Sequence, residues 1–412
     1  MRRILLATAF VTATTGASGV ECDPDDGGLS LPEGFCALVI ADDLGPARHM
    51  AVTAEGDLYV ALRDLGDEVG GIAALRDTDG DGRMDEQMRF GENAGTGIRV
   101  HSGYLYFGED RRVMRYPLHE QYLGPADGDP EVIAAGFPVA GLEAGKTLAF
   151  DGRERLYVSA AHTDGCAGDT AARESFPHGG CVQAPPAGGI WRFDAHMPGQ
   201  DRQEDGEPYA TGLRHALAIA WNPVAESLYA IQQGDHEPAT GETISGATDI
   251  MTAAELLRIT AGSDFGWPHC YQDGAWQVPR TPSLQDDDNA RCPLERPPPE
   301  LTFHRTRDPA DMLFYGNGNF PGHYHGGAFI TFGSTQGGSH QGGVIVFVAF
   351  TDDARPTPYI ATFASGPSPH EASGVDGDRQ FQPMGLAAGP DGSLYVTDSR
   401  YGRVWRIMYL GE

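Results

Sequence analysis

A short phrase ending in Leu-Tyr-Val, or a close variant of it, recurs along the whole chain. Its six copies begin at positions 57, 104, 155, 227, 327 and 393. Each copy is followed by a second strand-like phrase, such as residues 343–347 after the fifth. A repeat of about 45 to 100 residues built from short alternating strands is typical of a β-propeller. Six copies therefore predict an all-β fold with six blades, whose chemistry lies on loops at the mouth of the central channel.

The chain length fits one propeller and nothing more. Its 412 residues are consumed almost entirely by six blades, so we expect the propeller to span residues 30–412 without a second domain. The 56 glycines and 29 prolines suit a loop-rich β protein, and no long 3.6-residue periodicity competes with this interpretation.

The first 19 residues have the features of a secretory signal peptide. Arg2 and Arg3 precede a mostly apolar stretch, and small residues follow at positions 17–19. The apolar stretch is too short to span a bilayer. We therefore expect a periplasmic or secreted protein without a membrane-spanning segment.

Six cysteines agree with export. Six cysteines allow 15 pairings. Each cysteine has one other cysteine close to it in the sequence, and a disulfide that closes a short loop costs the least entropy. Zinc binding is the alternative, although the chain contains no Cys-x-x-Cys spacing. The expected disulfides are Cys22–Cys36, Cys166–Cys181 and Cys270–Cys292.

The chain is strongly acidic, with a formal net charge of −29. This charge argues against nucleic acid and anionic membranes as partners. It suits a well-solvated exported protein.

The strongest local motif is an acidic loop at residues 77–85. Acidic residues at its positions 1, 3, 5 and 9, with Gly82 at position 6, reproduce most of an EF-hand-type calcium loop. Met88 occupies position 12, so the usual bidentate glutamate is missing. A solvated Asp-Gly turn is the alternative. The predicted calcium ligands are the side chains of Asp77, Asp79, Asp81 and Asp85 and the backbone carbonyl of Arg83.

Several phrases resemble a known family. They are residues 47–52, 75–82, 264–268 and 389–395, and their order and spacing are similar to the sorbosone dehydrogenase branch of the quinoprotein sugar dehydrogenases. That group includes soluble glucose dehydrogenase and the fungal pyranose dehydrogenases. The resemblance extends from about residue 31 to residue 407, almost the whole mature chain.

The resemblance implies a six-bladed propeller that holds pyrroloquinoline quinone (PQQ) over the channel mouth with a bridging calcium ion. In the family, a histidine takes a proton from the sugar hydroxyl while hydride passes to the quinone, and arginines and a lysine bind the three carboxylates of the cofactor. A trianion needs fixed cations, and hydride loss needs a base. A carbohydrate substrate and an external electron acceptor are implied as partners.

The family positions map onto this chain with substitutions. Glu143 stands where the base histidine is expected, Lys146 matches the branch with a lysine, and Arg214 matches a cofactor-contacting arginine. His215 replaces an asparagine. The carbonyls of the segment containing Gly234 and Asp235 align with those that hold the bridging calcium.

Other positions depart from the family pattern. Gln382 and Met384 stand where arginines are expected, and an arginine-bearing loop is shortened at residues 332–337. Trp267 lies in an aromatic loop that can stack on a sugar. Two functions follow: a PQQ-dependent sugar dehydrogenase with Glu143 as its base, or a non-catalytic propeller that binds a glycan or another small ligand. A calcium-dependent lactonase is a third idea, for which no cluster of Asp, Asn and Glu is evident.

Overall fold

The structure of the chain is a computed structural model. It describes residues 20–64, 66, 69–119, 121–125, 130–138, 145–161, 188–233, 254–266, 271–272, 279–280, 296–303, 308–316, 318–333, 343–366 and 381–411.

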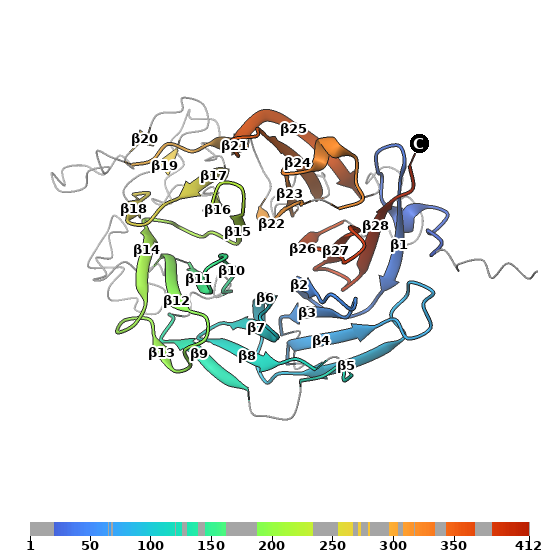
Figure 1. Cartoon of the computed structure of the whole chain (residues 1–412), viewed down its shortest axis with the longest axis horizontal. Helices are drawn as coiled ribbons and strands as arrows, with labels where there is room; N and C mark the ends of the chain where they lie inside the picture. The colour runs from blue at the N-terminus through green and yellow to red at the C-terminus, as the bar shows by residue number, and fades with distance from the viewer. Residues whose placement is uncertain are drawn as a thin grey trace, which may run out of the picture.

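These residues form a six-bladed β-propeller (Figure 1), which confirms the expected fold. Blade 1 contains β2 (Ala47–Val52), β3 (Leu58–Leu62), β4 (Gly71–Arg76) and β5 (Glu86–Phe90). Blade 2 contains β6 (Gly95–His101), β7 (Tyr104–Glu109), β8 (Val113–Pro117), β9 (Glu131–Ala135) and β13 (Gln200–Asp201). Blade 3 contains β10 (Leu148–Phe150), β11 (Arg155–Ala160), β12 (Gly189–Asp194), β14 (Glu207–Thr211) and β18 (Ser263–Asp264).

Blades 4 to 6 complete the ring. Blade 4 contains β15 (Ala218–Asn222), β16 (Ser227–Gln232), β17 (Ala254–Ile259) and β21 (Leu301–Phe303). Blade 5 contains β22 (Pro309–Phe314), β23 (Ala328–Phe332), β24 (Val344–Phe350) and β25 (Pro356–Ser365), and blade 6 contains β26 (Pro383–Ala388), β27 (Leu394–Asp398), β28 (Val404–Tyr409) and β1 (Phe35–Ala41). The remaining short elements are β19 (Tyr271–Gln272), β20 (Pro279–Arg280), η1 (Asp26–Gly28) and η3 (Gly322–Tyr324).

The recurring phrase of the sequence is the second strand of every blade. Strand β3 is buried along its whole length, because each blade is covered on both faces by its neighbours. The tyrosine of the phrase fills the space between blades, and its hydroxyl needs a buried partner. The hydroxyls of Tyr59, Tyr106 and Tyr229 donate to backbone carbonyl oxygens at 3.0, 2.8 and 2.9 Å. The repeat therefore encodes the packing between blades and, at these three copies, a buried hydrogen bond as well.

The N-terminal strand closes the ring. Strand β1 pairs antiparallel with β28, so blade 6 combines both ends of the propeller. A disulfide between Cys22 and Cys36 holds the segment that precedes this strand, as expected. The pairs Cys166–Cys181 and Cys270–Cys292 lie outside the described residues.

The first strand of each blade lines the channel. Strands β2, β6, β10, β15, β22 and β26 lie next to one another around the axis (Figure 1). Each begins where the second strand of its blade ends, as the pairing of Ala47 with Leu62 and of Pro383 with Asp398 shows. Residues just before these six strands therefore meet at one end of the channel, which we call the entrance end.

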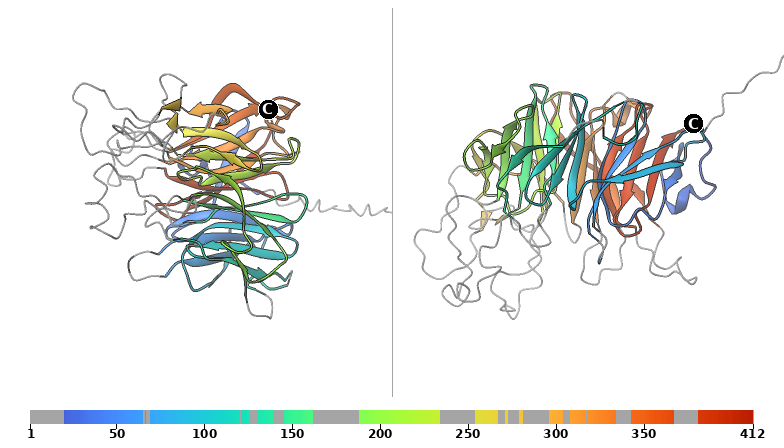
Figure 2. Two further views of the ribbon diagram at one scale, coloured as in Figure 1. Left: turned by 90° about the vertical axis from the view of Figure 1, so that its left-hand side faces the viewer. Right: turned by 90° about the horizontal axis from the view of Figure 1, so that it is seen from below.

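Seen from its edge, the propeller is a disc in which the strands run from one face to the other (Figure 2). None of the described helical segments is long and apolar enough to cross a membrane.

Candidate functional site

The middle of the channel is occupied by an ion pair between opposite blades. The guanidinium of Arg99 in blade 2 lies 3.1 Å from a carboxylate oxygen of Asp311 in blade 5. Asp311 is fully buried and also accepts the backbone N–H of Leu386 at 3.0 Å. His49 lies beside this pair, with Nδ1 3.9 Å from the carboxylate and Nε2 2.8 Å from the carbonyl oxygen of Ala310. Burial lowers the pKa of His49 to about 4, so this ring is neutral at physiological pH.

Cationic side chains converge at the entrance end. Arg48 is the second residue of β2, and Arg63 follows β3. Lys146 precedes β10, and Arg214 precedes β15. Arg63 forms a bidentate ion pair with Asp110. The charge of Arg63 lowers the pKa of both Arg48 and Lys146, so Arg63 lies near each of them.

Lys146 is fully buried between blades 2 and 3. Its Nζ lies 3.4 Å from the carbonyl oxygen of Pro138, and its own carbonyl accepts the N–H of Gly97 at 2.8 Å. Burial lowers the pKa of Lys146 to about 8, since desolvation penalises the charged form. The only lysine of the chain is therefore a cation held in a site that disfavours its charge.

Arg48 is a candidate site residue to which the sequence analysis assigned no role. Burial, together with the charge of the nearby Arg63, lowers its pKa to about 10. Its Nε is buried and has no hydrogen-bond partner among the described residues. The signal in the sequence was a cation at the start of an inner strand, the same signal that identified Arg214.

Arg214 is positioned by a chain of polar groups in blade 4. Its backbone N–H donates to Oε1 of Gln232 at 3.1 Å, and Nε2 of Gln232 donates to Glu255 at 3.2 Å. Glu255 in turn forms a buried ion pair with Arg296, with a shortest distance of 2.9 Å. Burial raises the pKa of Glu255. Since every polar group in this hydrogen-bonded series has a partner, the backbone at Arg214 is rigidly held.

His215 follows Arg214 and is buried. Burial lowers its pKa to about 3, and the charge of Arg214 lowers it as well, so the ring is neutral at physiological pH. The Gln233 side chain interacts with the ring, yet neither ring nitrogen has a hydrogen bond of acceptable geometry to a described residue. A neutral imidazole of this kind can accept a proton or a hydrogen bond.

Unpaired buried polar atoms cluster at the entrance end. Four of the five such atoms among the described residues lie here: Nε of Arg48, Oγ1 of Thr96 and both ring nitrogens of His215; the fifth, Nδ1 of His49, lies beside the Arg99–Asp311 pair. Buried polar atoms in proteins almost always have a hydrogen-bond partner. In the described part of the chain, the exceptions thus indicate a place for a polar ligand. The hydroxyl of Thr147, next to Lys146, links neighbouring segments at this end: it lies 2.7 Å from Oγ of Ser159 and 3.3 Å from the Ala216 carbonyl oxygen.

Four of the sequence-predicted site residues meet at this end: Lys146, Arg214, His215 and Gln382. Gln382 precedes β26, and its backbone N–H donates to the Asp398 carboxylate at 2.7 Å. The predicted residues Glu143, Gly234, Asp235 and Trp267 lie outside the described residues.

The acidic loop lies at the opposite end, in the hairpin between β4 and β5. Ligand oxygens of Asp77, Asp79 and Asp81 approach within 4.8 Å of one another. Asp85 is directed elsewhere, since its carboxylate accepts the N–H and the hydroxyl of Thr78 at 2.8 and 2.5 Å. Three of the four predicted carboxylates are thus grouped as a calcium site requires.

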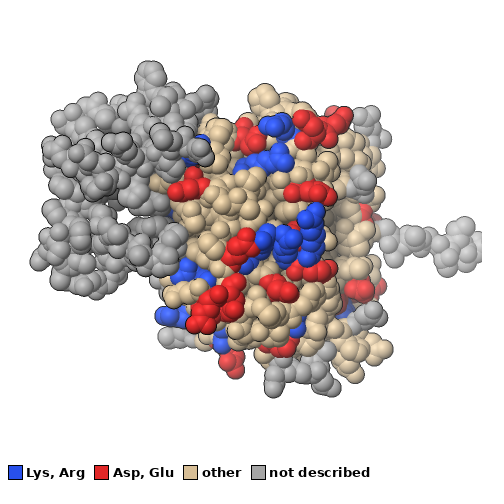
Figure 3. All heavy atoms as spheres, turned by 60° about the vertical axis from the view of Figure 1, so that its left-hand side comes forward, with Lys and Arg blue, Asp and Glu red and all other residues tan. Residues whose placement is uncertain are grey.

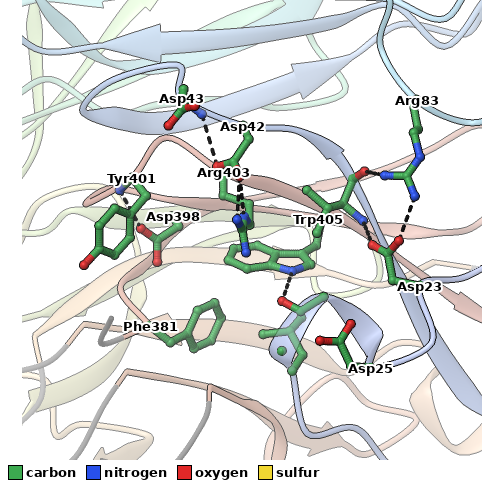
Figure 4. Close-up of a pocket in the computed structure, with 14 residues that line it drawn as sticks. Asp23, Asp25, Asp42, Asp43, Arg83, Phe381, Asp398, Tyr401, Arg403 and Trp405 are labelled. Carbon is green, nitrogen blue, oxygen red and sulfur yellow. Dashed lines mark hydrogen bonds and ion pairs between the residues drawn. The ribbon is translucent and has the colours of Figure 1, made fainter. Parts of the chain in front are cut away.

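A cavity of about 470 Å³ lies at blade 6, and its lining includes Asp23, Phe381, Asp398 and Trp405 but none of Arg48, Lys146 and Arg214 (Figure 4). Its charged side chains largely pair with one another. Arg83 lies 2.7 Å from Asp23, and Arg403 lies 2.5 Å from Asp42. Of the sequence-predicted residues, only Arg83 lines this cavity, so we do not place the functional site there.

The surface is charged but mixed on the side shown in Figure 3, where basic and acidic side chains lie next to one another. Ion pairs such as that between Arg192 and Glu207 join basic and acidic side chains of the protein. On this side the acidic excess does not form one continuous patch.

Comparison with known proteins identifies the family. A family model described as TrAA12-like matches residues 29–409. The chain belongs to the TrAA12-like family. Among curated proteins, no sequence matches this TrAA12-like chain significantly.

Solved structures share the fold of this TrAA12-like protein. The iodide structure of a Trichoderma reesei enzyme of carbohydrate-active enzyme family AA12 has a TM-score of 0.71 at 20% identity, covering 93% of this chain and 98% of that one. The holo pyranose dehydrogenase PQQ domain of Coprinopsis cinerea has a TM-score of 0.70 at 18% identity, covering 92% and 96%. The PQQ-bound aldose sugar dehydrogenase of Streptomyces coelicolor has a TM-score of 0.56 at 16% identity, covering 92% and 100%.

Proposed function

We propose that this protein is an exported quinoprotein-type sugar dehydrogenase, which oxidises a C1 hydroxyl or aldehyde of an aldose or a sorbosone-like sugar with PQQ. Membership in the TrAA12-like family and the fold shared with PQQ-containing sugar dehydrogenases support this proposal. The observation that carries it is the group of cations and unpaired polar atoms at the entrance end of the channel.

The cations of this group suit a polyanionic cofactor. Arg48, Lys146 and Arg214 come from three different blades, and burial lowers the pKa of both Arg48 and Lys146. Keeping charged groups desolvated costs free energy unless an anion compensates them. The three carboxylates of PQQ are such a partner, and arginine matches a carboxylate bidentately. The residues present therefore fit the cofactor.

Bound PQQ would supply the two-electron acceptor for sugar oxidation. The residues of this chain then have separate tasks. Arg48, Lys146 and Arg214 would hold the carboxylates of the cofactor, Gln382 would offer an amide, and Trp267 would stack on the sugar. Glu143 would take the proton of the sugar hydroxyl, and an external acceptor would take up the two electrons removed from the sugar.

The base is a point where this chain departs from the family pattern. A carboxylate such as Glu143 has an ordinary pKa near 4.3 and is a weak base at neutral pH unless its surroundings raise that value. His215 is a neutral imidazole at the entrance end, but burial lowers its pKa to about 3, so without a bound anion it is a weaker base than an ordinary carboxylate. It is the residue to test if Glu143 proves dispensable.

Calcium belongs to the same proposal. The carbonyls of Gly234 and Asp235 would hold the calcium ion of the cofactor site, and the Asp77–Asp79–Asp81 group would bind a structural ion at the opposite end. A calcium structure of the Trichoderma reesei protein exists among the structures with this fold.

We also propose a periplasmic or secreted location. The signal-like residues 1–19 motivate it, and the Cys22–Cys36 disulfide supports it, since disulfides persist in oxidising compartments.

The second candidate function is non-catalytic binding of a glycan or another small ligand. It is favoured by Glu143 in place of the base histidine and by Gln382 and Met384 in place of arginines. In that case the cations at the entrance end would bind a different anionic or polar group.

Calorimetric titration of PQQ with calcium into the full-length mature protein tests the proposal. We expect one-to-one binding, which a Lys146→Met plus Arg48→Leu variant loses, and oxidation of aldoses by the loaded protein. An Arg153→Ala variant, on an exposed turn, is the matched control. Binding without oxidation of any sugar would favour the second function, and absence of binding would rule out the first.

A further inference from the structure

Two histidines and a glutamate converge on the face opposite the entrance end. His101 ends strand β6 of blade 2, Glu154 lies in the turn between β10 and β11 of blade 3, and His196 follows β12. Nε2 of His101 lies 2.5 Å from Oε2 of Glu154, and Nε2 of His196 lies 2.9 Å from the same oxygen. Residues from three separate segments thus direct their ligand atoms at one point.

We propose that His101, Glu154 and His196 form a binding site for a zinc-class divalent transition-metal ion that links blades 2 and 3. Two imidazoles and one carboxylate are a ligand set found in zinc sites. The three ligand atoms all lie within 4.8 Å of one another. Ligands at about 2.0 to 2.2 Å from a tetrahedral zinc ion are about 3.4 Å apart, so modest side-chain rotations create the geometry.

The two histidines are held in place by groups that do not touch the ion. The ring of His101 stacks on Phe150, with centroids 4.2 Å apart and planes at 7°. The backbone N–H of His196 donates to the Asp194 carboxylate at 2.8 Å. Nε2 of Gln200 donates to the carbonyl oxygens of Asp194 and Met197 at 2.8 and 2.7 Å, which fixes the turn that carries His196.

The turn that carries Glu154 is also fixed by hydrogen bonds. Glu154 adopts a left-handed backbone conformation with φ of 60°, which costs free energy for a residue with a Cβ. Asp151 stabilises this turn by accepting the N–H groups of Arg153 and Arg155 at 2.8 and 3.1 Å. The Glu154 carbonyl accepts the N–H of Ala195 at 3.1 Å, which joins the turn to the His196 segment. Such support from outside the ligand set is typical of metal sites.

Solvent access suits a metal ion with one exchangeable position. The side chain of His101 is 17% exposed, whereas those of Glu154 and His196 are 51% and 46% exposed. Three protein ligands leave the fourth tetrahedral position to water. The site is at the far end of the channel from the cations, so it is independent of the proposed function.

Zinc titration of the full-length, metal-free protein tests the proposal. A His101→Ala plus His196→Ala variant should bind one equivalent of zinc less than the wild type. A His119→Ala plus His323→Ala variant removes two exposed histidines elsewhere and should retain the wild-type stoichiometry. Comparing the variants cancels any binding by the other histidines of the chain. Equal stoichiometry in all three proteins would overturn the proposal.

Glu154→Gln provides a test that preserves side-chain volume. Mutation of a residue that only hydrogen-bonds a metal ligand typically lowers metal affinity about 10- to 100-fold. Loss of a direct ligand should therefore weaken zinc binding by at least about 100-fold. Cobalt(II) provides the spectroscopic check: we expect visible absorption typical of a tetrahedral ion in the wild type and its loss in Glu154→Gln. An unchanged zinc affinity in Glu154→Gln would mean that the cluster is only a hydrogen-bonded bridge between blades.

Discussion

Arg99 and Asp311, which are 212 positions apart in the sequence, face each other across the channel at 3.1 Å. This pair ties blade 2 to blade 5, and the N–H of Leu386 adds blade 6 to the same carboxylate. The channel is therefore braced at its centre, while the groups proposed to bind the ligand lie at its entrance end.

Removing the carboxylate of this pair should destabilise the fold. Asp311→Ala leaves the Arg99 charge and the buried N–H of Leu386 without their partner, and breaking a buried ion pair costs about 3 kcal/mol or more. Urea denaturation of the mature protein measures the loss. Arg153→Ala, which breaks an exposed pair with Glu226 at 3.9 Å, should change stability by no more than about 0.5 kcal/mol. Similar effects of both substitutions would show that the central pair is not structurally important.

Quinone affinity should decrease as pH rises above about 8. Burial lowers the pKa of Lys146 to about 8, so the free protein loses this cation in that range, and an anionic ligand loses a partner. The dissociation constant should increase by up to about tenfold per pH unit. Calorimetry between pH 7 and 9.5 tests this, with Lys146→Met as the comparison. That variant should bind more weakly at every pH and without the change near pH 8; the same change in both proteins would assign it to another group.

Turnover should depend on Glu143. A positioned general base contributes about 10²- to 10⁴-fold, so Glu143→Gln should lower kcat by at least about 100-fold while PQQ still binds. Glu204→Gln, in an exposed turn, is the control for removing one carboxylate from an acidic protein. Loss of turnover in His215→Asn together with normal turnover in Glu143→Gln would assign the base to His215 instead.

The protein should lose stability on acidification below about pH 6.5. Burial lowers the folded-state pKa values of His49 and His215 to about 4 and about 3, whereas the unfolded chain binds these protons near pH 6.5. Between these values the unfolded state binds more protons, so stability falls with falling pH by up to about 1.4 kcal/mol per unit for each histidine. Thermal unfolding from pH 7 to 4 should show a smaller slope for His215→Asn than for the wild type, and an equal slope would refute this contribution.

Calcium should raise the melting temperature through the acidic loop. An ion at 100 times its dissociation constant adds about 2.7 kcal/mol of stability, which the triple substitution of Asp77, Asp79 and Asp81 by Asn should remove. Asp85→Asn should weaken calcium binding less, because Asp85 is bonded to Thr78 and lies apart from the three grouped carboxylates. The measurement is the calcium-induced melting shift in each variant. An equal loss in both variants would place Asp85 among the ligands.

The sequence alone determined the architecture, because the features that define it are local. The recurring Leu-Tyr phrase predicts the second strand of each of six blades, since a buried strand with a tyrosine for the space between blades has a recognisable pattern. The short spacing of Cys22 and Cys36 likewise predicted their disulfide, and chain position placed Lys146 and Arg214 before inner strands.

Only the tertiary structure decided which side chains meet and how strongly each is desolvated. The position of Arg48 at the start of an inner strand is visible in the sequence, but its full burial next to Arg63 is known only from the tertiary structure. The partnership of Arg99 with Asp311, and the convergence of His101, Glu154 and His196, depend on closing the ring of blades. Such contacts join segments far apart in the chain, and no local pattern of residues encodes them.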